Sequence, residues 1–234
     1  LEVKLYSVRN TPIYFSLAVT LEGKHLNFSG VAPFVKIAVW KVFRGLNYQT
    51  DIATILEAIN DVLGVARDLN IAVINLSIIA DEINFHLDSA VNKLASAGIV
   101  VVTPAGNRYL NCDAKENQIT SPGTAYYSIT VAALNSRSGI AFYSSVGGNY
   151  TVRDLGLYVK PDIAFFGGGL LYGWWPLGLD SDENDFIFED RTTGDFYVDL
   201  GTSYATAFVS GFVAYIASFF MKEGRWEWSL DTVL

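Results

Sequence analysis

Several residue types that carry common protein chemistry are scarce in this sequence of 234 residues. Cysteine occurs once, at Cys112, and histidine twice, at His25 and His86. A lone cysteine cannot form a disulfide within the chain, and it cannot supply a thiolate metal cluster. We therefore expect neither feature here.

Basic residues are also in the minority. The chain has 16 Lys and Arg against 24 Asp and Glu, a net charge of −8 and a pI of about 4.7. Nucleic acids and anionic membranes are bound through an excess of Lys and Arg, so neither is an expected partner. No basic segment followed by an apolar stretch opens the sequence, and Leu1 stands where an initiator Met would. We expect a processed or excised piece with no signal peptide present.

Apolar material is plentiful, at 51% hydrophobic and 14% aromatic residues. A chain of this length can form one large core, so we expect a single domain over 1–234, incomplete at both ends.

Apolar periodicity predicts alternating strands and helices. The expected strands are 1–6, 35–43, 71–76, 99–102 and 129–133, and the expected helices are 13–20, a helix capped by Thr50 and Asp51, and 87–97. This alternation predicts an α/β fold of three layers, α/β/α, with a mainly parallel sheet between helices. Ligands of such sheets bind at the carboxyl ends of the strands.

The most informative run is GTSYATAFVSG at residues 201–211. It places the Ser203 hydroxyl where a long uncharged helix begins, and the free backbone N–H groups there can hold an anion, as acyl transfer requires. The same run also fits a capped core helix or a membrane span. Because Lys222 follows directly, we expect a soluble core helix over 203–221 with a cleft at its N-terminal end.

Further motifs lie at predicted strand ends and beyond. In chain order they are GVAP at 30–33, VINLS at 73–77, VVVTPAGN at 100–107, SPG at 121–123, IAFYSSVG at 140–147 and KPDIA at 160–164. In this order, and together with the run at 201–211, they resemble the subtilisin-like serine peptidases (subtilases) over nearly the whole chain. Taken alone, the Gly106-Asn107 pair also fits an ordinary turn at a strand exit.

The resemblance implies site residues by position. Ser203 matches the nucleophile, and Asn107 matches the side-chain amide that donates to the developing oxyanion. The segments that border the substrate in the family match Ser77, Ile79, Pro104, Ala105 and Gly106. Ser203 and Asn107 should then converge on one small pocket.

Departures from the family pattern concern the rest of the catalytic triad. The family's catalytic His would fall near Thr11, and too little sequence precedes Thr11 for the strand that carries the catalytic Asp. Neither His25 nor His86 matches the motif. Without a base, the serine hydroxyl stays protonated and is a poor nucleophile. Ile79 stands where the family has Gly, and other replacements near the cleft are Tyr126, Phe166, Ala207 and Phe208.

Residues 167–200 form an insertion-like tract that is rich in aromatic and acidic residues. Its oxygen ligands Asp180, Asp182 and Asn184 could hold Ca²⁺, but an EF-type loop needs a Gly and a terminal Glu that are missing, which favours a solvated loop and no cofactor. The aromatic residues predict packing against another protein segment or subunit; they are Tyr172, Trp174, Trp175 and Phe186. Sequons at Asn27 and Asn149 favour an extracellular or cell-surface location, and a third at Asn75 is expected to be buried.

Two functions stay open. One is a subtilase domain that has lost its triad and binds a protein or peptide within a larger extracellular or cell-surface protein. The other is an active serine endopeptidase whose Asp and His come from a segment outside this chain.

Overall fold

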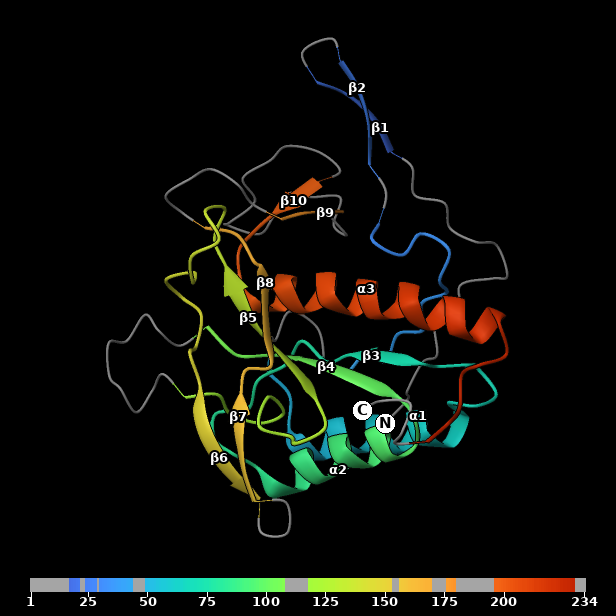
Figure 1. The fold of residues 1–234 in the computed structure, drawn as a ribbon, viewed down its shortest axis with the longest axis vertical. Helices are drawn as coiled ribbons and strands as arrows, with labels where there is room; N and C mark the ends of the chain where they lie inside the picture. Colours follow the sequence, from blue (N-terminus) through green and yellow to red (C-terminus); the bar gives the residue numbers. More distant parts are fainter. Residues whose placement is uncertain are drawn as a thin grey trace.

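The structure is a computed structural model that describes residues 17–21, 24–28, 30–43, 49–107, 118–152, 156–169, 176–179 and 196–229. A four-stranded sheet lies at its centre, between helices on both faces (Figure 1). The strands are β3 (Val73–Asn75), β4 (Val100–Pro104), β5 (Ile129–Leu134) and β8 (Ile163–Phe166), in that spatial order, and all neighbours are parallel. The expected α/β architecture with a parallel sheet is confirmed.

Two helices cover one face of the sheet. Helix α1 (Ile52–Val65) begins after Asp51, whose carboxylate accepts from Thr54 N at 2.7 Å. Helix α2 (Phe85–Ser96) begins after Asn84, which caps Leu87 N at 3.0 Å. These side chains satisfy backbone donors that have no partner within the helix, so both predicted helices start close to where the sequence placed them.

The third helix, α3 (Thr202–Lys222), lies on the opposite face and contacts all four strands of the sheet. Strand β4 is buried on both sides and shows how the layers divide. Val101 packs with α1 and α2 in one core cluster, whereas Val100 and Val102 pack with Ala205 and Val209 of α3 in another. Side chains alternate along a strand, so one continuous apolar run serves both cores.

Three antiparallel hairpins surround this body. They are β1 (Leu17–Leu21) with β2 (Lys24–Phe28), β6 (Gly148–Val152) with β7 (Gly156–Lys160), and β9 (Leu177–Leu179) with β10 (Phe196–Val198). The first hairpin projects away from the sheet and its helices (Figure 1). The last pair lies in the predicted insertion-like tract.

Some expected elements are wrong. Residues 35–43 form no strand; Trp40 packs on α1, where its indole Nε1 donates to Asp61 at 2.7 Å, while Ile37 is 71% exposed. Residues 17–20 of the predicted helix 13–20 belong to β1 instead, and residues 13–16 lie outside the described residues, as does the predicted strand 1–6. The sequence analysis also missed β8.

Helix α3 confirms the predicted helix, but only part of it is core. Its buried residues face the sheet and include Thr206, Val209, Ser210 and Ala217, whereas Phe212, Tyr215, Ile216 and Phe219 are about half exposed. By length and composition alone, α3 could cross a membrane. The apolar outer face explains that signal, and the sheet contacts show that the inner face packs within the domain.

Candidate active site

The N-terminal end of α3 meets the segment that leaves β4. Thr202 is fully buried, and its backbone N and its hydroxyl Oγ1 each donate to Asn107 Oδ1, both at 2.9 Å. The hydroxyl of Thr202 also accepts from Gly106 N at 3.2 Å. Two segments 95 residues apart in sequence are therefore joined by three hydrogen bonds.

These bonds fix the orientation of the Asn107 amide. Because Oδ1 is bonded to Thr202, the donor end, Nδ2, is left without a hydrogen-bond partner among the described residues, and Asn107 itself is exposed. Nδ2 lies beside the backbone of Gly201, 3.3 Å from the point that a Cβ there would occupy. The arrangement leaves a neutral donor beside Gly201, two residues before Ser203, and a neutral donor is the kind of group that stabilises an oxyanion.

Ser203 is the second residue of α3 and is partly exposed. In the part of the chain that the structure describes, its hydroxyl has no hydrogen-bond partner. The end of β3 lies close by, because Ser77 Oγ donates to Ser203 O at 3.4 Å. Asn75 extends this network, with its Oδ1 accepting from Ser210 Oγ of α3 at 3.0 Å. The predicted positions Ser203, Asn107 and Ser77 thus come together.

The remaining predicted substrate residues lie before Asn107 in β4 and its exit, or next to Gly106 in the case of Ile79. Pro104 and Ala105 are buried at the end of β4, so their side chains take no part in the surface. Gly106 has a φ of +109°, and a Cβ there would lie 3.0 Å from Ser145 Oγ and 3.6 Å from Ile79 Cδ1. The branched Ile79 side chain therefore occupies space directly over Gly106.

A buried tyrosine holds the backbone segment that pairs with Gly201, just before α3. Tyr143 donates to Gly167 O at 2.5 Å and is within 2.9 Å of Gly168 O, and Gly201 N donates to Gly167 O at 2.9 Å. Burial raises the pKa of Tyr143, so its hydroxyl remains a neutral donor. The backbone just before α3 is consequently held in place by Gly167, which Tyr143 in turn fixes.

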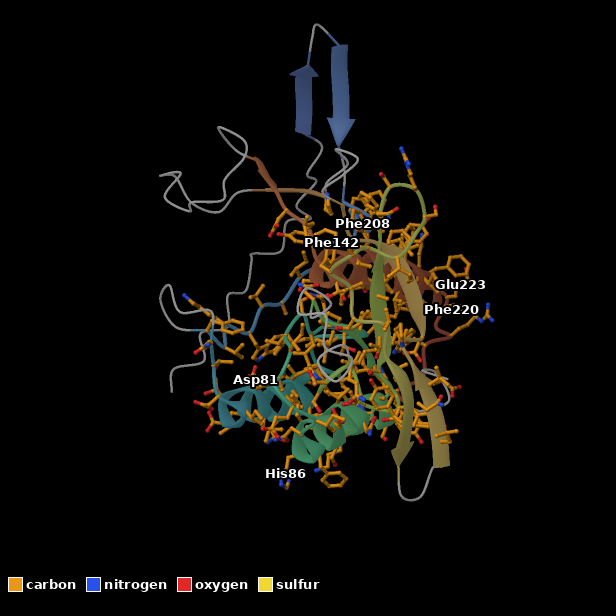
Figure 2. All side chains as sticks on the ribbon, turned by 90° about the vertical axis from the view of Figure 1, so that its left-hand side faces the viewer. Asp81, His86, Phe142, Phe208, Phe220 and Glu223 are labelled. Atoms are coloured by element: carbon orange, nitrogen blue, oxygen red, sulfur yellow. The ribbon has the colours of Figure 1, made fainter. Side chains whose placement is uncertain are left out.

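No histidine lies beside Ser203 in the described residues. The carboxylate of Asp199 is near the start of α3, where it accepts from the Tyr204 hydroxyl at 3.2 Å and from Leu200 N at 2.7 Å. His86 is exposed at the start of α2, on the sheet face opposite to α3, and Figure 2 shows it far from Phe208 of α3. His25 belongs to β2, in the hairpin that projects from the body. Thr11 lies outside the described residues.

Other predicted features can be placed only in part. Asp180, Asp182, Asn184 and the aromatic residues Tyr172, Trp174, Trp175 and Phe186 all lie outside the described residues. Within those described, no cluster of three metal-ligating side chains occurs. Asn75, the first residue of its sequon, is exposed, contrary to expectation, and no described strand pairs with the outer edge of β3. Asn149 is exposed as well.

The sequence analysis gave no role to Thr202 or Asn75. Thr202 lies within the run GTSYATAFVSG, and a buried hydroxyl next to the predicted nucleophile was the signal that could have marked it. Asn75 lies in VINLS, two residues before Ser77, where it joins β3 to α3.

In a comparison with known families, the family model described as "Subtilase family" matches residues 16–232. The chain belongs to the subtilase family. The match covers β3, β4 and α3, and thus every described residue of the candidate site.

Proposed function

We propose that this chain is a catalytically degenerate subtilase domain that binds an extended protein or peptide segment. The observation that carries the proposal is that the described residues bring the predicted nucleophile and the predicted oxyanion donor together without a histidine beside them. Asn107, Thr202 and Ser203 are assembled at the start of α3, while the one imidazole whose side chain is described, His86, lies on the other face of the sheet. A hydroxyl without an imidazole to take its proton does not attack a peptide bond at a useful rate.

The surface at the start of α3 carries groups that suit binding. The free donor of Asn107 and the partly exposed Ser77 and Ser203 can bond to the backbone of an extended ligand. Ile79 adds an apolar contact while narrowing the space over Gly106. Such a surface favours small side chains beside Gly106.

We place this activity in a larger extracellular or cell-surface protein. Asn149, the first residue of the sequon Asn149-Tyr150-Thr151, is exposed and could accept a glycan. The half-exposed apolar side chains on the outer face of α3 favour packing against a further protein segment or subunit.

Fluorescein-labelled casein, an unfolded protein, tests binding and cleavage together. We expect it to bind without being hydrolysed, and Ser77→Arg to weaken binding because Ser77 contacts Ser203. Asp68→Arg, at an exposed position beyond the end of α1, is the matched control and should bind like the wild type. Hydrolysis that Ser203→Ala abolishes would contradict the proposal.

A second function has a specific observation in its favour. Leu76 N donates to Val102 O, and Val100 N donates to Ala72 O, so the alternate residues Val73 and Asn75 direct their backbone groups away from β4. No described strand pairs with that edge. A segment from outside this chain could add a strand there and bring an Asp and a His to Ser203. Mass spectrometry of the native protein would then find a second subtilase-like segment that co-purifies with this chain.

A further inference from the structure

Among the described residues, one carboxylate oxygen is buried without a hydrogen-bond partner. Asp88, in the first turn of α2, accepts from Thr124 Oγ1 through Oδ2 at 2.7 Å, whereas its Oδ1 has no hydrogen-bond partner among the described residues. An ionised carboxylate in this position loses water contacts that nothing replaces. Burial accordingly raises the pKa of Asp88 above its ordinary 3.8, against the opposite effects of Ser121, Thr124 and Lys160.

The charged groups around Asp88 do not satisfy this oxygen. Lys160 of β7 is buried, but its ammonium group donates to Ser128 O at 2.5 Å and to Asp162 at 2.7 Å. Tyr158 of β7 donates to Thr124 O, not to the carboxylate. On α2 itself, His86 and Lys93 line a groove that faces α1, and residues 121–125 carry no charge.

Asp88 contacts a segment that supports the candidate site, here called the cleft loop (residues 121–125). Ser121 of this loop accepts from Ala80 N through its carbonyl at 2.8 Å, and its Oγ accepts from Asn84 N at 2.7 Å. Just before the loop, Thr120 Oγ1 donates to Ala80 O at 2.7 Å. A Cβ on Gly123 would lie 2.9 Å from Pro104 O. The cleft loop therefore packs behind Ile79 and behind the end of β4.

We propose that Asp88 is a proton-dependent latch for the cleft loop: neutral Asp88 keeps the loop closed against α2, and ionised Asp88 favours its release. The direction follows from linkage. Release exposes the carboxylate to water and returns its pKa toward 3.8, so the closed state binds the proton more tightly than the released state. Lower pH consequently favours the closed loop, and with it a fixed position for Ile79 and Ala80.

The consequence for ligand binding rests on the proposed function, whereas the latch itself does not. If residues 77–80 contact the peptide, its affinity rises as the pH falls through the range in which Asp88 takes up its proton.

Hydrogen exchange of single amides tests the latch in the full chain. The amides of Ala80 and Asn84 report on the cleft loop because both donate to Ser121. Their protection is expressed relative to an unstructured peptide at the same pH. For the wild type, we expect protection to rise as the pH falls from neutral through the range in which Asp88 takes up its proton, because the closed state holds that proton more tightly than the released state.

Three variants decide the outcome. Asp88→Asn is neutral at every pH and should show high protection that does not change with pH. Thr124→Val removes the donor to Asp88 and should lower protection throughout. Glu82→Gln removes an exposed carboxylate and should behave like the wild type.

The latch is overturned if wild type and Asp88→Asn have the same pH profile, or if Asp88→Asn is less protected than the wild type at neutral pH. Absence of casein binding would count against the proposed function and would leave the exchange result unchanged.

Discussion

Thr202 determines how the amide of Asn107 is used. Its backbone N and its hydroxyl occupy Asn107 Oδ1, so the donor end of the amide stays free, and the hydroxyl also satisfies Gly106 N. A residue that touches no ligand thus sets the chemistry of one that could. Asp88 acts in a similar indirect way, because it contacts Thr124 of the cleft loop, and the cleft loop in turn contacts Ala80.

Replacing Thr202 tests its part in this network. Thr202→Val keeps the shape but leaves Gly106 N and one lone pair of Asn107 Oδ1 unsatisfied in a buried place, so the free energy of unfolding should fall by about 1–3 kcal/mol. Thr202→Ser, which keeps the hydroxyl, should lose less. Urea denaturation measures both, and equal stability of Thr202→Val and the wild type would contradict the network.

The raised pKa of Asp88 predicts a pH dependence of stability. The native state holds a proton that the unfolded state has already released between pH 3.8 and the raised value, so the free energy of unfolding should fall as pH rises through that window. Asp88→Asn should lack this fall and be more stable than the wild type at neutral pH. Urea unfolding across a pH series would refute the prediction if the wild type instead gained stability relative to Asp88→Asn.

The helices differ in how closely their backbones approach other parts of the chain. On α1, Gly64 has no neighbouring atom within 4 Å of a Cβ built there, whereas on α3 a Cβ at Gly211 would lie 2.8 Å from Val31 Cβ. Val31 belongs to the turn at residues 31–35, whose Val35 N donates to Ala32 O. Gly211 is therefore the point at which this turn docks on α3.

This difference predicts opposite effects of the same substitution. Gly64→Ala should stabilise the protein by about 0.5–1 kcal/mol, because Ala loses less backbone freedom in a helix than Gly does. Gly211→Ala should destabilise it, since the added methyl forces Val31 away. Thermal unfolding of the two variants is the measurement, and a gain in stability for Gly211→Ala would show that the turn does not pack on α3.

At the scale of the whole molecule, apolar periodicity predicted those helices and strands whose formation depends on short stretches of sequence. Caps and apolar spacing located α1 and α2, and buried apolar runs located β3, β4 and β5. The strand predicted for residues 35–43 was wrong. Their apolar alternation suits a strand only if another strand lies beside them, and Trp40 packs on α1 instead. Pairing of that kind depends on distant segments and leaves no trace in local spacing.

The same limit applies to the site. Ser203 and Asn107 could be named from motifs, but the bonds of Thr202 to Asn107, and of Asn75 to Ser210, join residues that are 95 and 135 positions apart in sequence. Only the crossing of α3 over the ends of β3 and β4 brings them together. The half-exposed outer face of α3 was equally invisible, since an uncharged run of small and apolar residues fits a fully buried helix as well.

The central claim is that this chain binds but does not cleave, and labelling with a fluorophosphonate tests it most directly. The reagent reacts only with a serine whose hydroxyl is activated by a base. In the isolated chain we expect Ser203 to remain unlabelled, at the level of Ser203→Ala. Stoichiometric labelling that Ser203→Ala abolishes would show that a base reaches Ser203, and would contradict the account.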